Sequence, residues 1–388
     1  VRKQATKTLE NHVVIFRGMM PRYGLINVSA SLTFSKRRDS EKPLVHGVFN
    51  KDTAVTAKSG KMECSPKRFL QQVANSMSAL ICGSLAYDTI MVFPERFKDH
   101  ILPDKVHILN VSFLVPEMRR QFGGVAGNIA YNLKLLGGDP YPMATVGDDF
   151  GPYQRRLESL GISTRYIRHL EGEFTPQAFI TTDVDDNQIT AFHPGAMQES
   201  QLNKVGNTDG ITLGIVAPDG REAMLQHSRD FERHGIPHIF DPGQAMTLFD
   251  GDDLKTFIQQ ANWLVCNDYE FQLIHERTGM SQEKIASQLE ALIITSGSKG
   301  SRLINKAGEE HIETVEPTAV LDPTGCGDAY RSGLIYGLLN DLDLVTACRI
   351  GSVMGALKVA VQGPQNHAPT MDEIVDTFKK AFGYSFNG

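Results

Sequence analysis

The sequence lacks the features that define several protein classes. It has five cysteines among 388 residues, an odd number with no Cys-x-x-Cys pair. This argues against a disulfide scaffold and against a cysteine-bound zinc site. No apolar run approaches the roughly 20 residues that a membrane-spanning helix needs. We therefore predict a protein that does not span a membrane and whose compartment is a reducing cytoplasm.

Two common nucleotide-binding motifs are also missing. The first strongly apolar run after residue 77 leads into Gly83-Ser84 and not into Gly-x-Gly-x-x-Gly. The run Gly297-Ser298-Lys299-Gly300 does not have the Gly-x-x-x-x-Gly-Lys-Ser/Thr spacing of a P-loop. A dinucleotide-binding half and a P-loop are therefore disfavoured.

Charge is distributed unevenly along the chain. Residues 1–76 carry 14 Lys and Arg against 5 Asp and Glu, a net charge of +9, and the other 312 residues carry -15. The acidic main body argues against nucleic acid as a partner. We predict that residues 1–76, which show no sustained helix or strand period, form a basic disordered extension that is dispensable for folding and activity. A basic docking arm is the alternative, and a basic, acid-poor leader also resembles an organellar transit peptide.

From residue 77 to the C-terminus, short apolar runs alternate with helical patterns. This alternation predicts an α/β fold, a mainly parallel sheet with helices on both faces. The expected strands are Leu80–Cys82, Met143–Val146, Thr212–Val216, His238–Phe240, Trp263–Cys266 and Leu292–Thr295. The expected helices are Asn128–Leu136, Asp252–Ala261, Glu270–Arg277 and Gly327–Asn340.

Two extended segments with turn chemistry interrupt the alternation. Val106–Val115 and Gln177–Phe192 read as extended, and the second contains a polar turn at Asp183–Asn187. They predict a small β lid built from about residues 106–122 and 177–194. A structural flap without a gating role is the alternative.

Polar residues follow three of the expected strands. They are Asp241-Pro242-Gly243, Asn267-Asp268-Tyr269-Glu270 and Thr295-Ser296-Gly297. Ligands of open α/β sheets lie at the carboxyl ends of the strands. These residues therefore predict a ligand site at that edge.

The string Asp322-Pro323-Thr324-Gly325-Cys326-Gly327-Asp328 precedes the longest expected helix. Glycines allow a tight turn whose N–H groups point outward and add to the positive end of the helix dipole. Gly325, Cys326 and Gly327 therefore predict an anion hole for a phosphoryl group. Asp328 would repel phosphate, but as a general base it could accept the proton of an attacking hydroxyl. The alternative is a helix-capping aspartate in a glycine turn.

This string resembles the C-terminal signature of the ribokinase-like, or PfkB, family of sugar and nucleoside kinases, with Cys326 in place of the usual Ala or Val. Gly123-Gly124-Val125-Ala126-Gly127-Asn128 and Thr145–Gly151 resemble further family motifs. The resemblance runs from about Met77 to the C-terminus. It implies a ribokinase-like kinase domain over residues 77–388, with ATP as co-substrate and Mg²⁺ as cofactor.

The resemblance also implies roles for individual residues. Asp88 and Asn128 would bind sugar hydroxyls, together with Ser84 and Gly124, although an aspartate at position 88 could also cap a turn. Glu270 would hold magnesium through water, or serve only as a first-turn helix acid. The residues implied to contact ATP are Asn267, Ser296, Gly297, Gly325, Gly327, Gly363 and Asn366.

Val111–Val115 and Phe192–Met197 resemble segments of bacterial adenosine kinases. There, Phe192 and Met197 would touch the base, unless both are core residues of the lid, and Ser112 and Gln244 would reach its polar edge. We therefore expect ATP-dependent phosphorylation of the 5′-hydroxyl of adenosine. Ala178 stands where an aromatic clamp is expected, which puts selectivity for adenine in question.

Several alternatives to an adenosine kinase remain open at this point. They are a broad nucleoside kinase that takes inosine, guanosine or cytidine, another sugar kinase of the family, and a nucleoside-binding protein without catalysis. A homodimer formed through the lid and activation by a monovalent cation are also open.

Overall fold

The computed structural model describes residues 78–101, 110–185 and 187–387, and the backbone of three strands nearer the N-terminus. The chain divides into two units, Val1–Phe69 and Leu70–Gly388. In the first unit, β1 (Val13–Met20), β2 (Gly24–Thr33) and β3 (His46–Val48) form an antiparallel sheet in the order β1-β2-β3. These strands were not predicted from the sequence. The rest of residues 1–76 lies outside the described part, so the dispensability of this extension stays a prediction.

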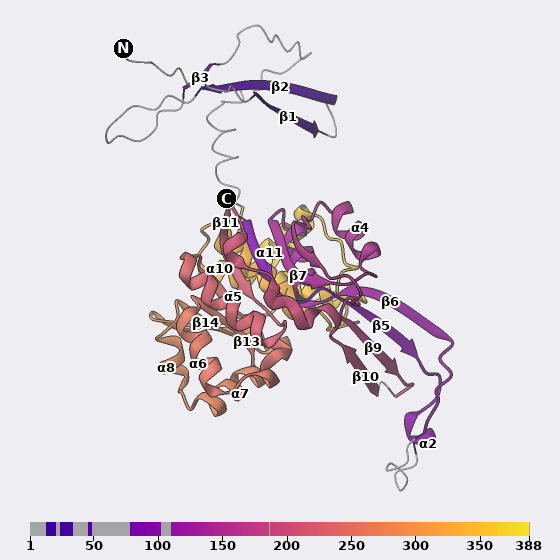
Figure 1. Ribbon diagram of the computed structural model, residues 1–388. Helices are drawn as coiled ribbons and strands as arrows, with labels where there is room; N and C mark the ends of the chain where they lie inside the picture. Colours follow the sequence, from indigo (N-terminus) through magenta and orange to yellow (C-terminus); the bar gives the residue numbers. More distant parts are fainter. Residues whose placement is uncertain are drawn as a thin grey trace, which may run out of the picture. The chain divides into compact units, whose positions relative to one another are not determined.

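A nine-stranded sheet forms the centre of the second unit, in the order β16-β15-β14-β13-β12-β11-β4-β7-β8 (Figure 1). Neighbouring strands from β14 to β8 are parallel, and β15 and β16 join the edge as antiparallel strands. The strands are β4 (Ser78–Cys82), β7 (Asp139–Val146), β8 (Tyr166–His169), β11 (Ile211–Val216), β12 (His238–Phe240), β13 (Trp263–Asn267), β14 (Ala291–Thr295), β15 (Ser301–Asn305) and β16 (Gly308–Ile312). All six expected strands are confirmed.

Helices cover both faces of this sheet, because successive strand residues point to opposite sides. In β4, Ile81 packs into a core with residues of α3, α4, α9 and α10, and Leu80 packs into a second core with residues of α5, α6, α7 and α8. The helices are α3 (Val125–Leu135), α4 (Gly151–Ser159), α5 (Arg221–His234), α6 (Gly251–Gln260), α7 (Asp268–Thr278), α8 (Gln282–Ala286), α9 (Cys326–Leu339), α10 (Leu344–Val359) and α11 (Met371–Phe382). The four expected helices correspond to α3, α6, α7 and α9, and the predicted α/β fold is confirmed.

A smaller four-stranded sheet projects from this layer, with α2 (Phe97–His100) at its far end (Figure 1). Its order is β10-β9-β5-β6, formed by β5 (Ala86–Val92), β6 (Glu117–Gly123), β9 (Gln177–Thr182) and β10 (Gln188–His193). The pairs β10/β9 and β5/β6 are antiparallel and β5/β9 is parallel. We refer to these four strands as the lid sheet.

The lid sheet differs in two ways from the lid that the sequence predicted. It includes β5, which follows directly after the first strand of the main sheet and was not anticipated. The expected extended segment Val106–Val115 is wrong for residues 110–115, which form no strand, and residues 102–109 lie outside the described part. Phe113 explains the irregular path, because its ring packs against Phe93 and Phe97 beyond the end of β5.

Among the described residues, none of the helices combines the length and the apolar character that a membrane span requires.

Candidate active site

The chain reverses its direction of progress across the main sheet next to β4. From β4 the sheet grows through β7 to β8, and β11 then returns to the other side of β4. Such a switch point opens a crevice at the carboxyl ends of the strands, where open α/β sheets bind ligands. β4 ends at Cys82, so Gly83 and Ser84 lie at this crevice.

The glycine turn before α3 fits tightly against the end of β4. Gly124 has a φ of 81°, and a Cβ there would lie 2.6 Å from the Ser84 carbonyl oxygen and from the Ala86 nitrogen. Only glycine adopts this conformation at such a close approach. The Ser84 hydroxyl accepts a hydrogen bond of 3.3 Å from the Val125 N–H. Ser84 and Gly124 therefore fix the start of α3 at the crevice.

Asn128 and Asp328 come together at the centre of this crevice. The Asn128 Nδ2 donates a hydrogen bond of 2.8 Å to Oδ2 of Asp328, which lies in the first turn of α9. The Asn128 Oδ1 accepts a hydrogen bond of 3.0 Å from Gln365, whose Nε2 also donates to the Tyr153 hydroxyl at 2.7 Å. Tyr153 in turn donates to the Gly123 carbonyl at 2.8 Å. A continuous hydrogen-bond network thus links the two glycine motifs.

This network gives Asn128 a role that the sequence did not predict. Its side chain is 5% exposed, and both of its polar atoms bond to protein groups. An amide has two donor hydrogens and a carbonyl with two lone pairs, so it retains capacity for a sugar hydroxyl. In this structure the Asn128 side chain orients the carboxylate of Asp328, in addition to any contact with a sugar hydroxyl.

The Asp328 carboxylate has an environment suited to a base. Desolvation raises its pKa, and the charge of Arg331 together with the hydrogen bond from Asn128 opposes that rise. A catalytic base works best when its pKa is brought closer to the working pH. The net result is that the pKa of Asp328 lies above the usual value of an aspartate, which favours this carboxylate as a proton acceptor.

Arg331 lies one turn further along α9 and is buried against Asp241, which directly follows β12. Its Nη2 donates a hydrogen bond of 2.6 Å to Oδ1 of Asp241, and its Nε pairs with the other carboxylate oxygen. Arg331 and Asp241 are 6% and 1% exposed, and a bidentate ion pair of this kind holds both groups in place. A Cβ on Gly327 would lie 2.8 Å from Nη1 of Arg331, so this glycine also lets the guanidinium approach the helix start.

The start of α9 has the backbone geometry that the predicted anion hole requires, with one difference. Gly325 has a φ of 79° and caps α9, and no described residue accepts a hydrogen bond from the N–H of Gly325 or Gly327. The N–H of Cys326 is not available, because it donates to the Pro323 carbonyl at 3.1 Å. The hole is therefore built from the two glycines at the positive end of the helix dipole.

Asp88 reaches this site from the lid sheet. Register places Asp88 opposite Gln121 on one side and Ala178 on the other, and Ala178 opposite Phe192. Directly opposed residues project from the same face of a sheet. One face therefore presents Asp88, the small Ala178 and the 52% exposed Phe192 in a row.

Asp88 also has a shifted pKa. Burial, together with the negative charges of Asp328 and Asp322, raises the pKa of Asp88 to about 6. A Cβ on Gly123 would lie 2.4 Å from its Oδ2, so glycine is required there too. Asp88 and Asp328 therefore lie close enough for their charges to interact.

Asn267 and Glu270, the implied magnesium element, form a capping box at the start of α7. Glu270 accepts a hydrogen bond of 2.8 Å from the Asn267 N–H, and Asn267 Oδ1 accepts one of 2.8 Å from the Glu270 N–H. Among the described residues, no group of three or more His, Cys, Asp or Glu is arranged to hold a metal ion. The single carboxylate of Glu270 keeps a second oxygen beyond the cap, which fits a magnesium ion that retains most of its waters.

The residues implied to contact ATP lie on loops that border the anion hole and β14. The Gly363 N–H donates to Oδ2 of Asp322 at 2.7 Å, which joins the loop after α10 to the loop before α9. Asn366 is exposed and donates to the Gln362 carbonyl at 2.9 Å. Ser296 donates to Asp268 at 2.6 Å and precedes Gly297, whose φ is 53°.

The residues expected to contact the base are only partly brought together. Phe192 lies on the Asp88 face of the lid sheet, and Met197 is half-buried in η2 (Gly195–Leu202). Gln244 is exposed in η4 (Gly243–Leu248). Ser112 is not brought to the cluster, because the adjacent Phe113 packs at the α2 end of the lid sheet.

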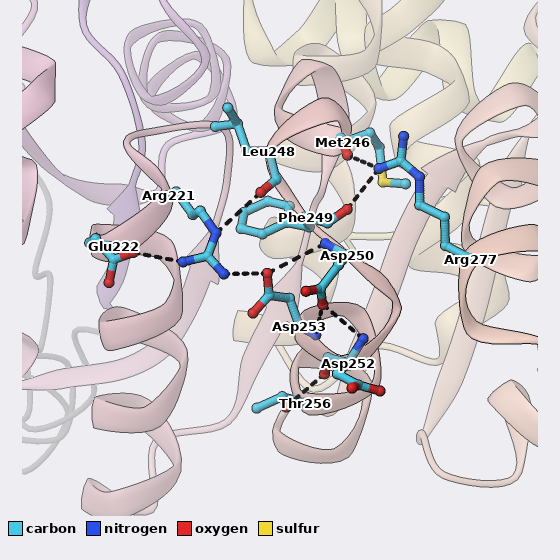
Figure 2. Close-up of polar contacts among 10 residues, drawn as sticks. All are labelled: Arg221, Glu222, Met246, Leu248, Phe249, Asp250, Asp252, Asp253, Thr256 and Arg277. Atoms are coloured by element: carbon cyan, nitrogen blue, oxygen red, sulfur yellow. Dashed lines mark hydrogen bonds and ion pairs between the residues drawn. The ribbon is translucent and has the colours of Figure 1, made fainter.

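Two arginines fix the segment that carries Gln244, as Figure 2 shows. Arg221 Nε donates to the Leu248 carbonyl at 3.2 Å, and Arg277 Nη1 donates to the Phe249 carbonyl at 2.8 Å and to that of Met246. Asp250, next in the chain, caps α6 (Figure 2). The segment that joins Asp241 to α6 and includes Gln244 is therefore held in place at the end next to α6.

Sequence reasoning missed three side chains of the site. They are Arg331, Gln365 and Tyr153. Arg331 stands three residues after Asp328 on one helix, and this spacing places the two on neighbouring positions of its surface. Gln365 lies inside the loop already noted for Gly363 and Asn366, but nothing in the local pattern around Tyr153 pointed to the site.

The comparisons with known proteins agree with this geometry. Residues 85–371 match the pfkB family carbohydrate kinases. The nucleoside kinase of Methanocaldococcus jannaschii is 32% identical over 275 residues, 70% of this chain and 90% of that protein. The solved structure of Burkholderia thailandensis nucleoside kinase in complex with inosine is 51% identical, with a TM-score of 0.73, and covers 79% of this chain and 99% of its own. The same enzyme in complex with ADP-inosine is 53% identical with a TM-score of 0.71, over 79% and 97%.

The chain belongs to the PfkB family of carbohydrate kinases, as the resemblance predicted. It is a phosphotransferase that acts on a hydroxyl group, which confirms the prediction of an enzyme. A binding protein without catalysis is thereby set aside.

Proposed function

We propose that this chain transfers the γ-phosphoryl group of ATP to the 5′-hydroxyl of a nucleoside, and that adenosine is one of several nucleosides that it accepts. The observation that carries the proposal is the Asn128–Asp328 pair beside the anion hole, with Asp88 facing it from the lid sheet. Relatives that are nucleoside kinases, one of them solved with inosine, support the substrate class.

Each group has a role in the proposed reaction. Asp88 accepts hydrogen bonds from the ribose hydroxyls and so places the 5′-hydroxyl near Asp328. Asp328 takes the proton of that hydroxyl while its oxygen forms a bond to the γ-phosphorus. The bond from this phosphorus to the β–γ bridging oxygen breaks, and ADP leaves. The N–H groups of Gly325 and Gly327 bind the oxygens of the transferred group as charge develops on them.

Magnesium would bind at the nucleotide edge of the site. Mg²⁺ bound with ATP would supply positive charge that offsets the negative charge of the phosphates. Glu270 and Asn267 would hold its waters from the start of α7. Arg331, paired with Asp241, places a further fixed positive charge beside Gly327.

The base site favours breadth over strict adenine selectivity. Ala178 leaves open space between Asp88 and Phe192 on the lid face. Phe192 offers an exposed aromatic surface that every base can contact. Contact with a ring face discriminates little among bases, since each has one, so inosine, guanosine and cytidine are expected beside adenosine.

The test is ADP release with Mg-ATP and a panel of adenosine, inosine, guanosine, cytidine, ribose and fructose 6-phosphate. We expect kcat/KM values for adenosine and inosine within about tenfold of each other, because a sequence-tolerant stacking contact should separate the two bases by no more than about 1.4 kcal/mol. Ala178→Phe should reduce the range of nucleosides that the protein accepts and leave kcat/KM for ribose unchanged. Activity with a free sugar alone would contradict the proposal.

The opposite face of the lid sheet supports a homodimer formed through the lid, which the sequence left open. Met118, Phe179 and Ile189 project from it and are 70%, 39% and 44% exposed. Exposed apolar groups gathered on one face favour association. Light scattering of the protein tests this directly, and a Met118→Asp variant should then be monomeric.

A further inference from the structure

Lys358 is the one buried lysine among the described residues. It lies in the last turn of α10 and is 0% exposed. A buried ammonium group is strongly disfavoured unless polar groups surround it. The neighbours of Lys358 therefore show what holds it there.

Those neighbours are carbonyl oxygens and one carboxylate. The Lys358 Nζ donates to the Asp322 carbonyl at 2.7 Å and to the Val361 carbonyl at 3.1 Å. Its distance to Oδ2 of Asp322 is 3.9 Å. The other titratable groups whose charge couples to it are Cys326 and His367.

The two carbonyls belong to the two loops that form the nucleotide side of the site. Asp322 opens the loop that leads into the anion hole, and its carboxylate accepts hydrogen bonds from the Thr324 N–H at 2.9 Å and the Gly363 N–H at 2.7 Å. Val361 opens the loop that carries Gly363. Lys358 thus lies behind the anion hole and binds to both of its supporting loops.

The burial of Lys358 is better explained by a role in positioning the two loops than by a contribution to the free energy of unfolding. Buried ion pairs often add nothing to stability compared with apolar side chains of the same size. An apolar residue would leave the carbonyls of Asp322 and Val361 without this donor. The loops would then be joined only by the hydrogen bond from the Gly363 N–H to Asp322 and by those that the Val359 carbonyl accepts from the N–H groups of Leu321 and Asp322, so their spacing would be less tightly fixed. A catalytic site loses rate steeply when its groups shift by an ångström.

We propose that the Lys358 ammonium group is a built-in monovalent cation that holds the anion hole in its active geometry. Carbonyl oxygens and a carboxylate are also the ligands that a free monovalent cation would use. The side chain supplies the same single charge from within the fold, so turnover needs no added monovalent cation. Lys358 is a positioning residue, and the proposal rests on the proposed kinase function.

The first test uses the unaltered protein. Its turnover is measured with Mg-ATP and inosine in potassium, ammonium, sodium and choline chloride at equal ionic strength. The proposal predicts the same kcat, within about twofold, in all four salts, since bulk screening is equal at equal ionic strength. A requirement for potassium or ammonium would overturn it. Absence of turnover on every nucleoside would instead refute the kinase function.

The second test removes the ammonium group with Lys358→Met, which is similar in length. In choline chloride we expect a loss of kcat on the order of 10²-fold, with a smaller change in KM for inosine, because only the phosphoryl side is displaced. Potassium or ammonium should restore part of kcat, because a free cation can then enter between the carbonyls. ADP affinity from calorimetry should weaken and recover in the same salts.

Lys379→Met on the exposed side of α11 is the matched control and should behave as the unaltered protein. Full kcat of Lys358→Met in choline chloride would overturn the proposal, and so would a loss that no salt restores in a variant with an unchanged Tm. If Lys358→Met does not fold, the salt series on the unaltered protein still decides the matter.

Discussion

Asn128 on α3 donates a hydrogen bond of 2.8 Å to the carboxylate of Asp328 on α9, although 200 positions separate the two residues. The contact joins the first glycine motif to the second. It also ties the residue proposed as base to a helix that begins at the substrate side of the crevice. The orientation of Asp328 therefore depends on both halves of the domain.

This contact predicts a pH effect for Asn128→Ala. The hydrogen bond from Asn128 stabilises the ionised carboxylate and lowers the pKa of Asp328, so its loss raises that pKa further. The base must be ionised, so the acidic limb of the kcat profile should move to higher pH. Asn132→Ala, one turn along α3, is the control and should leave the limb in place. An unshifted limb in Asn128→Ala would contradict this role.

The raised pKa of Asp88 predicts weaker nucleoside binding in acid. Its carboxyl has a pKa of about 6 and accepts sugar hydroxyls only when ionised, so affinity should fall as the pH drops below 6. Calorimetry with inosine and no ATP measures this without a contribution from turnover. Asp88→Asn should bind about 10- to 100-fold more weakly and lose the pH dependence. Affinity that stays constant from pH 5 to pH 8 would argue against the assignment.

The Arg331–Asp241 pair predicts a stability effect. Arg331→Met leaves the Asp241 carboxylate buried without its partner, and we expect a loss of about 3–5 kcal/mol in the free energy of unfolding. The double variant Arg331→Met, Asp241→Leu removes both charges and should recover most of that loss. Urea unfolding of the two variants gives the comparison. Equal instability of the single and double variants would mean that the pair is not what holds this region.

Much of the fold could be predicted from the sequence because its signals are local. The strands of the parallel sheet are short apolar runs, and glycine turns precede α3 and α9. The lid sheet was only half predicted. In β5 the apolar alternation is interrupted by Asp88 and Thr89, and its partners in β9 lie some ninety residues further on.

The residues of the site likewise fall into those that the sequence predicts and those that it does not. Asp328, Asn128 and the two glycines stand in compact strings whose chemistry can be read along the chain. Gln365 and Tyr153 take their roles from partners more than 200 positions away, which no local pattern reveals. Lys358 was not singled out in the sequence, because its role depends on its burial and its carbonyl partners.

The most direct test of the account is the Asp328→Asn variant. The change keeps the size of the side chain and removes the proton acceptor. With Mg-ATP and inosine, we expect kcat to fall by about 10²- to 10⁴-fold, while the calorimetric affinity for inosine changes little. That result would place Asp328 in the chemical step. Turnover near that of the unaltered protein would remove Asp328 from the mechanism and contradict the central claim.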